Sequence, residues 1–303
     1  MKLRHVVEAQ QFTVPMLMDL FDRTRAMERI VARGGTLDYR NKLMASLFYQ
    51  PSTRTRCSFE AAMYRLGGSV FSTEHARIFS SEVQGEQLED TIRIISGYTD
   101  VIVLRHSEVG GAARAAAVSR VPLINAGDGN GGQHPTQALL DLYTIFRERR
   151  MLEGLTIAMI GELDRGRTAR SLACLLGKFD RVKLYFVSPP EMQMKEDILD
   201  ELESRNVWYA LDSEMDRVIG SVDVVYLTQI RTGRLADEKG KGKFAIDAAT
   251  LARMKPDAMI LHPLPRTVEL DKAIDDDPRA FYFQQATNGL YVRMALLSMV
   301  LDS

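Results

Sequence analysis

The stretch LMASLFYQPSTRTRCSFEAAMYRLGGSVFST, residues 43–73, contains the pattern that decides the fold. An apolar run at 43–49 is followed by a polar turn, a segment with helical periodicity at 54–66 and a second strand-like run at 69–73. Apolar strands that alternate with helices are typical of parallel sheets covered by helices on both faces. This stretch therefore predicts an α/β fold.

The same alternation continues along the whole chain. Strands are expected at 43–49, 69–73, 101–105, 122–126, 155–160, 183–187, 224–228 and 258–262. Helices are expected between them at 54–66, 86–97, 135–149, 168–178 and 191–205, with a closing helix at 289–301. Four strands precede the helix that begins at Pro135 and four follow it, so this helix is expected to join two domains.

Two doubly wound parallel-sheet domains joined by the bridging helix are thus the expected architecture. The first comprises residues 1–133 together with the C-terminal helix 287–303, and the second comprises residues 134–286. In open α/β sheets, ligands bind at the carboxyl ends of the strands, where helix N-termini also point. We therefore expect the active site in the cleft between the domains, built from motifs that directly follow strands.

The composition excludes several classes of protein. The 303 residues include 39 Lys and Arg against 40 Asp and Glu, so the basic excess of a nucleic-acid binder is missing. The sequence contains no run of about 18 apolar residues, the length needed to span a membrane. No signal or transit peptide is evident. The two cysteines form no CxxC motif and the five histidines no HxH or HxxxH pair. We expect a cytoplasmic protein without a metal site or cofactor.

The turn after the first strand, Gln50-Pro-Ser-Thr-Arg-Thr-Arg56, combines two arginines and three hydroxyls at the start of a helix. Ser52 or Thr53 can cap this helix, and the free N–H groups of its first turn attract anions. The segment is suited to a phosphate group. A capped helix with solvated arginines is the alternative interpretation.

Two further polar residues lie at the expected strand ends. Arg105 ends the third strand, and His134 opens the bridging helix just before Pro135, a residue favoured in the first turn. A surface ion pair would explain Arg105 equally well, and a lone histidine is often structural. Because His134 shares its neighbourhood with Arg105 and Thr55, a functional role for His134 is weighed equally with a structural one.

Two loops match known nucleotide-binding motifs only in part, and a third loop is held rigid by two prolines. Gly127–Gly132 matches G-x-G-x-x-G but lacks the second strand of a dinucleotide site, and Gly161–Thr168 resembles a P-loop in which Arg167 replaces the lysine. A carboxylate bound by a helix N-terminus and Arg167 is the better interpretation of the second loop. The third, His262-Pro-Leu-Pro-Arg266, offers rigid backbone carbonyls, and its Leu264–Pro265 bond is a candidate for the cis form.

Together these segments resemble the aspartate/ornithine carbamoyltransferase family. The resemblance runs almost from end to end, and it is closer to the aspartate branch than to the ornithine branch, which differs at the first and last motifs. It is carried by STRTR at 52–56, VIVLRH at 101–106, NAGDG and QHPTQALLDLYTI within 125–145, GRT at 166–168, HPLPR at 262–266 and YFQQATNGLYVRMALL at 282–297.

The resemblance implies binding of carbamoyl phosphate and carbamoyl transfer to an amine. It assigns phosphate contacts to Ser52, Thr53, Arg54 and Thr55, and carbamoyl contacts to Arg105, His134, Gln137 and the carbonyls of Pro263 and Leu264. Thr55, Arg105 and His134 are the catalytic donors that would stabilise the tetrahedral oxyanion. The family also implies a homotrimer in which Ser80 and Gln84 come from the neighbouring subunit. Association with a regulatory chain or a dihydroorotase is left open.

The acceptor side departs from the family pattern. Gln84 replaces a catalytic lysine, Gln229 replaces the arginine that binds the β-carboxylate of aspartate, and Arg231 stands where glutamine is usual. Gln50 replaces a glutamate, whereas Arg167, expected to bind the α-carboxylate, is retained, as is Arg234. A glutamine does not replace a bidentate arginine.

These changes leave three hypotheses for the function. In the first, the protein carbamoylates a small amino acid other than aspartate. In the second, it is an ordinary aspartate carbamoyltransferase of pyrimidine biosynthesis, with Arg231 reaching the β-carboxylate from a shifted position. In the third, it is a catalytically silent homologue that supports a partner enzyme, although the complete phosphate motif argues against this.

Overall fold

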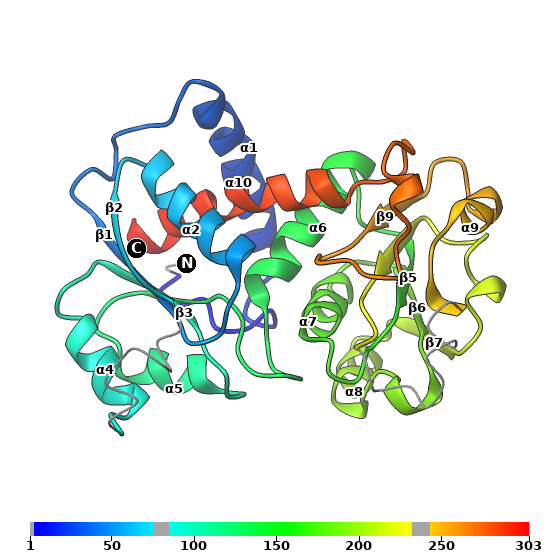
Figure 1. The fold of residues 1–303 in the computed structure, drawn as a ribbon, viewed down its shortest axis with the longest axis horizontal. Coiled ribbons are helices and arrows are strands. Elements are labelled where there is room, and N and C mark those ends of the chain that lie inside the picture. Colours follow the sequence, from blue (N-terminus) through cyan, green and yellow to red (C-terminus); the bar gives the residue numbers. More distant parts are fainter. Residues whose placement is uncertain (1–2, 75–84, 232–242, 303) are drawn as a thin grey trace. The chain divides into compact units, whose positions relative to one another are not determined.

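The computed structural model describes residues 3–74, 85–231 and 243–302 and shows two compact α/β units (Figure 1). One unit comprises Met1–Leu139 and Thr287–Ser303, and the other comprises Leu140–Ala286. Each contains one sheet, and all of the strand pairs in both sheets are parallel. The α/β fold class predicted from the sequence is confirmed.

The four-stranded sheet of the first unit has the strand order β2-β1-β3-β4. Its strands are β1 (Leu43–Phe48), β2 (Ser69–Glu74), β3 (Val101–Arg105) and β4 (Leu123–Asn125). Its helices are α1 (Val14–Ala32), α2 (Thr53–Arg65), α4 (Leu88–Ile95) and α5 (Gly111–Val118), joined by the start of α6 (Pro135–Arg149) and most of α10 (Tyr282–Leu301). Because β1 lies inside the sheet, the order reverses between β1 and β3, which makes a topological switch point.

Burial explains why these segments form a sheet covered on both faces. Ala45, Leu47, Ile102 and Leu104 point to one face and pack with buried residues of α4 and α5. The alternate residues of the same strands, among them Phe48, are also inaccessible to solvent. Strands buried on both faces are expected to be apolar throughout, which is the pattern in the sequence.

The five-stranded sheet of the second unit has the strand order β7-β6-β5-β8-β9. Its strands are β5 (Thr156–Ile160), β6 (Lys183–Val187), β7 (Trp208–Asp212), β8 (Val224–Leu227) and β9 (Met259–Leu261). Its helices include α7 (Arg167–Leu176), α8 (Glu196–Ser204) and α9 (Ala248–Arg253), with 3-10 turns η2 (Pro190–Met192), η3 (Met215–Arg217) and η5 (Lys272–Ile274). The order again reverses at the first strand of the sheet, between β5 and β8.

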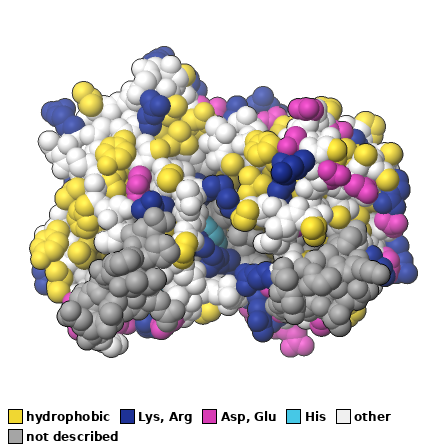
Figure 2. Space-filling model, viewed as in Figure 1, with side chains coloured by type: hydrophobic (Ala, Val, Ile, Leu, Met, Phe, Trp, Pro, Cys, Tyr) yellow, Lys and Arg dark blue, Asp and Glu magenta, His cyan; other side chains and the backbone are white. Residues whose placement is uncertain are grey.

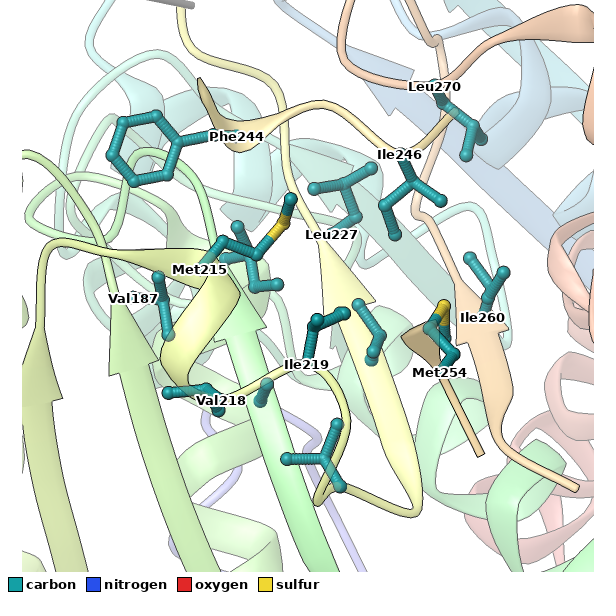
Figure 3. Close-up of a cluster of buried hydrophobic side chains, with 14 of the residues drawn as sticks. Val187, Met215, Val218, Ile219, Leu227, Phe244, Ile246, Met254, Ile260 and Leu270 are labelled. Carbon is teal, nitrogen blue, oxygen red and sulfur yellow. The ribbon is translucent and has the colours of Figure 1, made fainter. Parts of the chain in front are cut away.

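A large apolar cluster anchors the second unit. In Figure 3, Leu227 of β8 lies close to Ile246, and Leu270 lies beside Ile246. Ile260 of β9 and the loop residue Ile219 belong to the same cluster. All five are at most 1% exposed. Burying one such aliphatic side chain contributes about 1.5–3 kcal/mol. The cluster therefore fixes the segments that follow β8 and β9, which carry polar residues discussed below.

The structure differs from three sequence-based expectations. β7 was not predicted, because it is an edge strand whose Trp208 and Leu211 are 47% and 48% exposed, so it lacks the continuous buried pattern. The expected helix at 191–205 is interrupted: η2 ends at Met192 and α8 starts only at Glu196. The closing helix also starts earlier than expected, at Tyr282.

Basic and acidic side chains are interspersed on the face drawn in Figure 2. This agrees with the formal net charge of -1. Among the described helices, none is long and apolar enough to cross a membrane.

Candidate active site

The switch point of the first unit brings the first two sequence motifs together. β1 and β3 are paired so that Phe48 lies opposite Arg105, the last residue of β3. The chain leaving β1 runs directly into the start of α2 at Thr53. Arg105 and the first turn of α2 thus lie at the carboxyl ends of neighbouring strands, where ligands bind in this class of fold.

The first turn of α2 is not capped by a side chain. Ser52 is the N-cap residue, but its hydroxyl makes no capping hydrogen bond. The sequence left Ser52 and Thr53 as candidates for the cap, and no such hydrogen bond is made at the N-cap residue Ser52. The N-terminal N–H groups of a helix need acceptors, and an anion can supply them. Thr55 is 7% exposed and Arg56 is directed toward Ser72 and Glu60, so the turn presents a mixture of buried and accessible donors.

Arg105 and His134 meet around Gly127. Arg105 is 9% exposed and its Nη1 donates to the Ala126 carbonyl at 3.0 Å. A Cβ atom on Gly127 would lie 2.8 Å from Arg105 Nη1 and 3.0 Å from His134 Cδ2, and the residue has a φ of +111°. Only glycine fits this backbone and this space. The loop that resembled a dinucleotide motif instead lets two cationic or polar side chains approach the same point.

Asp128 holds the rest of this loop. Its Oδ1 accepts the Gln133 N–H at 2.7 Å and its Oδ2 accepts the Gly110 N–H at 3.0 Å. His134 itself is 4% exposed and its carbonyl accepts the N–H groups of Gln137 and Ala138, which starts α6. The hydrogen bonds of this loop therefore fix the backbone positions of His134 and Gln137.

The switch point of the second unit brings together residues that the sequence predicts for the acceptor side. Gly161, which follows β5, has a φ of +120°, and a Cβ there would lie 2.2 Å from the Thr228 carbonyl that follows β8. Arg231 approaches the same loop: its N–H donates to Glu162 Oε2 at 3.3 Å and its Nε lies 4.0 Å from Glu162 Oε1. The loop that contains Glu162 leads to Arg167 at the start of α7. Two arginines thus extend from the loops after adjacent strands.

Gln229 is bonded to a third loop. Its Nε2 donates to Thr267 Oγ1 at 3.2 Å. Thr267 closely follows the His262–Arg266 loop, in which the Leu264–Pro265 peptide is cis and Leu264 has a φ of +52°. Pro263 and Leu264 are partly exposed. Arg266 forms a bidentate pair with Asp275, and this pair lowers the pKa of Asp275 to about 2.

Glu269 is the buried charge behind this loop. It is 3% exposed and accepts hydrogen bonds from His262 Nε2 at 3.0 Å, from the Thr267 N–H at 2.8 Å and from Thr267 Oγ1 at 2.5 Å. Burial raises the pKa of Glu269, but the hydrogen bonds from His262 and Thr267 outweigh it and lower the pKa to about 2. Glu269 is therefore an ionised carboxylate at neutral pH.

Comparison with known protein families assigns both halves of the chain. Residues 4–147 match the carbamoyl-P binding domain of aspartate/ornithine carbamoyltransferase, and residues 153–300 match its Asp/Orn binding domain. The chain belongs to the aspartate/ornithine carbamoyltransferase family. It is a carbamoyltransferase that uses carbamoyl phosphate as donor.

Full-length relatives within this family are named for aspartate. The chain is 51% identical to aspartate carbamoyltransferase 1, chloroplastic, of Pisum sativum, over 99% of this chain and 79% of the relative. It is 44% identical to the aspartate carbamoyltransferase catalytic subunit of Thermoplasma acidophilum, over 99% of both chains. The name of the plant relative places that protein in the chloroplast, and the cytoplasmic location expected for this carbamoyltransferase stays a prediction.

Solved structures support the same assignment of the fold. The catalytic subunit of the M. jannaschii aspartate transcarbamoylase has a TM-score of 0.91 at 42% identity, covering 99% of this chain and 98% of that one. The Trypanosoma cruzi enzyme in complex with carbamoyl phosphate and aspartate has a TM-score of 0.93 at 38% identity, covering 99% and 96%.

Within each unit, the residues predicted for the carbamoyltransferase site lie at the end of a strand, in a loop that follows a strand, or in the first turn of the next helix. In the first unit these are Ser52, Thr53, Arg54, Thr55, Arg105, His134 and Gln137, and in the second Arg167, Gln229, Arg231, Pro263 and Leu264. Ser80, Gln84 and Arg234 lie outside the described residues. In the part of the chain that the structure describes, no group of three His, Cys, Asp or Glu side chains could hold a metal ion.

Sequence reasoning missed three residues near these positions. Gly127 was considered only as part of the G-x-G-x-x-G match and of the NAGDG motif, without a structural role, and Thr267 and Glu269 were not considered at all. The HPLPR motif ends just before Thr267, and a glutamate three residues beyond a motif carries no signal of burial. The contacts that reveal Glu269 and Thr267 become apparent only when the chain folds.

Proposed function

We propose that this carbamoyltransferase transfers the carbamoyl group to the amino group of aspartate, forming carbamoyl aspartate and phosphate. The observation that carries the proposal is the position of Arg231, which lies beside Glu162 at the same switch point as the loop leading to Arg167. The names of the full-length relatives support it as well. The second of the three hypotheses is thus favoured over an acceptor other than aspartate.

The first unit supplies the donor half of the proposed site. The phosphate of carbamoyl phosphate binds to the uncapped first turn of α2 and to the side chains of Ser52, Thr53, Arg54 and Thr55. Arg105, His134 and Gln137 surround the carbamoyl group, and Gly127 allows the first two to approach it together. Each donor aimed at a developing oxyanion contributes on the order of 10²–10³ in rate.

The reaction needs no nucleophilic side chain. The uncharged amine of aspartate attacks the carbamoyl carbon, a C–N bond forms, and the carbonyl oxygen becomes an oxyanion stabilised by Thr55, Arg105 and His134. The C–O bond to phosphate then breaks, and the leaving phosphate accepts the amine proton. The carbonyls of Pro263 and Leu264 accept hydrogen bonds from the carbamoyl amide and orient the incoming amine.

The second unit supplies the acceptor half. Arg167 binds the α-carboxylate and Arg231 the β-carboxylate, while Gln229 contributes a neutral amide. A charge-assisted hydrogen bond to a carboxylate contributes about 1.5–3 kcal/mol, so moving the cation from position 229 to position 231 preserves most of the affinity. Ser80 and Gln84 would come from the neighbouring subunit of a homotrimer, which remains a prediction of the family resemblance.

Phosphate release from purified protein with carbamoyl phosphate and a panel of amino acids tests the proposal. Aspartate is expected to be turned over in preference to asparagine and ornithine. Preference for another amine would overturn it in favour of the first hypothesis. No turnover of any amine, with retained binding of N-(phosphonacetyl)-L-aspartate, would overturn it in favour of the silent homologue.

A triple variant distinguishes the first two hypotheses independently. Gln84→Lys with Gln229→Arg and Arg231→Gln restores the usual family residues. If Arg231 already binds the β-carboxylate, kcat/KM for aspartate in this variant stays within about tenfold of its value in Gln84→Lys alone, because the changes at positions 229 and 231 exchange one cation for another. A much larger gain would mean that the natural residues select against aspartate.

A further inference from the structure

A continuous hydrogen-bonded network inside the second unit connects the loop after β9 with Gln229. We propose that Glu269 is a positioning residue at the branch point of this network, where it holds both the Pro263 and Leu264 carbonyls and the Gln229 amide. The proposal rests on the proposed function and extends it to a residue that contacts neither substrate.

Glu269 is itself fixed by the core of the second unit. Its carbonyl accepts the Ile246 N–H at 2.8 Å, and the next residue, Leu270, is buried in the apolar cluster of Figure 3. A carboxylate on such a rigid backbone can orient the groups that donate to it. Its three donors are His262 Nε2, the Thr267 N–H and the Thr267 hydroxyl.

The first branch runs through His262 to the carbonyl-bearing loop. The Leu264 N–H donates to His262 Nδ1 at 2.8 Å, so Nδ1 is unprotonated and Nε2 carries the hydrogen donated to Glu269. The His262 ring therefore bridges the buried carboxylate and the backbone of Leu264. Any rotation of the ring would change where the carbonyls of Pro263 and Leu264 point.

The backbone of His262 is held from the opposite direction. Its N–H donates to Gln285 Oε1 at 2.8 Å, and Gln285 Nε2 donates to Asp141 Oδ1 at 2.6 Å. Asp141 Oδ2 accepts the Tyr226 hydroxyl at 2.7 Å. Asp141, Tyr226 and Gln285 are at most 1% exposed. A buried network in which each donor has an acceptor fixes one geometry, so His262 has little freedom at either end.

The second branch runs through Thr267 to the acceptor side. An ionised carboxylate only accepts hydrogen bonds, so the Thr267 hydroxyl must give its hydrogen to Glu269. The Thr267 oxygen is then left to accept from Gln229 Nε2 at 3.2 Å. The charge of Glu269 thereby sets which end of the Gln229 amide faces Thr267, and the amide oxygen is turned away from it.

The two branches predict a pattern of kinetic effects. In Thr267→Val the hydroxyl is lost and Gln229 is released, so KM for aspartate should rise about threefold to tenfold, the effect of one neutral hydrogen bond. KM for carbamoyl phosphate should stay within about twofold. In Glu269→Gln both branches are disturbed, and kcat/KM should fall at least about tenfold for each substrate. The dissociation constant of inorganic phosphate, which binds to the first unit, should not change in either variant.

Two matched variants serve as controls. Thr267→Ser keeps the hydroxyl and should restore KM for aspartate. Val268→Ala changes the neighbouring side chain, which is 65% exposed, and should leave every parameter unchanged. In a Gln229→Ala background, Thr267→Val should have no further effect on KM for aspartate, because Thr267 then has no amide at position 229 to orient.

Several outcomes would overturn the proposal. Additive effects of Thr267→Val and Gln229→Ala would show that Thr267 does not act through Gln229. A loss of phosphate binding in Glu269→Gln that matches its loss of activity would indicate general destabilisation, as would an equal effect of Val268→Ala. If the wild-type protein does not turn over aspartate, the proposed function fails separately, and affinity for N-(phosphonacetyl)-L-aspartate in the same variants then tests the positioning role by the same criteria.

Discussion

The two units both contain a parallel sheet whose strand order reverses beside its first strand, but they form their halves of the proposed site in different ways. In each sheet the functional loops follow the two strands at that reversal. The first unit relies on the start of a helix and on Arg105 and His134 packed around a glycine. The second relies on side chains braced by the buried carboxylate of Glu269.

The difference agrees with the chemistry of the two substrates. The first unit matches a domain described as binding carbamoyl-P, whereas the second matches a domain described as binding Asp or Orn. Backbone N–H groups at a helix start can bind a phosphate whatever the neighbouring side chains are. An acceptor is distinguished by its side chain, so the residues that contact it are free to change. The substitutions at positions 229 and 231 lie in the second unit, which we call the braced unit because Glu269 holds its side chains. We therefore expect variants of the first unit to change the kinetic constants for carbamoyl phosphate, and variants of the second unit to change those for the acceptor.

The largest effect is expected from Arg105→Ala in the first unit. Removing this buried donor to the oxyanion should lower kcat/KM on the order of 10³-fold. Steady-state phosphate release measures it. Arg114→Ala is the matched control, because Arg114 lies in the same unit but is 47% exposed and pairs with Glu89 and Glu108. Similar losses in both variants would contradict a specific role of Arg105.

The second prediction concerns the acid stability of the braced unit. The pKa of Glu269 is lowered from 4.5 to about 2 in the folded protein, so its stabilising contribution is present above pH 4.5 and is lost as the pH falls toward 2. That contribution is on the order of 3 kcal/mol. Urea unfolding between pH 5 and pH 2.5 should show a shallower loss of unfolding free energy in Glu269→Gln than in the wild type. Parallel plots of unfolding free energy against pH for the two proteins would mean that the hydrogen bonds from His262 and Thr267 do not lower the pKa of Glu269.

The third prediction tests the shifted cation. Arg231→Ala should raise KM for aspartate about 10–100-fold, because a charge-assisted hydrogen bond to a carboxylate is lost. KM for carbamoyl phosphate should remain within about twofold, since the first unit is unchanged. Arg165→Ala removes a cation from the neighbouring loop, where Arg165 is 55% exposed, and should have no such effect. An unchanged KM for aspartate in Arg231→Ala would remove Arg231 from the acceptor site.

The prediction with the smallest expected effect compares the starts of two helices, α9 and α2. Asp247 caps α9 of the second unit by accepting the Thr250 N–H at 2.8 Å, so Asp247→Ala should cost about 1 kcal/mol of unfolding free energy. Ser52 makes no such bond, so Ser52→Ala should change the unfolding free energy by less than about 0.5 kcal/mol while raising KM for carbamoyl phosphate severalfold. A clear loss of stability in Ser52→Ala would mean that its hydroxyl caps α2 after all.

Local patterns in the sequence were sufficient for most of the fold. Each of the eight expected strands is present, and α6 spans the predicted residues 135–149. Most of these strands are apolar and buried, although β2 is a partly exposed edge strand. β7 was missed because Trp208 and Leu211 are half exposed, so it lacks a continuous buried pattern. The break before α8 depends on the backbone of residues 193–195, which apolar periodicity does not reveal.

The proposed site was predictable only where residues are contiguous. Ser52–Thr55 and His262–Arg266 form motifs that can be recognised along the chain. The relation between Gln229, Thr267 and Glu269 could not be predicted, because it depends on the loops after β8 and β9 meeting in space. The role of Gly127 was hidden for a similar reason, since its two neighbours come from β3 and from the start of α6.

The tight packing at Gly127 offers a way to separate the catalytic role of the protein in a cell from any role that needs only its presence. Adding one methyl group there would displace Arg105 or His134 and impose a strained backbone, although no substrate-binding group would be deleted. Gly127→Ala is therefore a way to abolish turnover by steric obstruction while the second unit is left intact. A cell that carries this allele would show which of its phenotypes depend on the product and which depend only on the presence of the polypeptide.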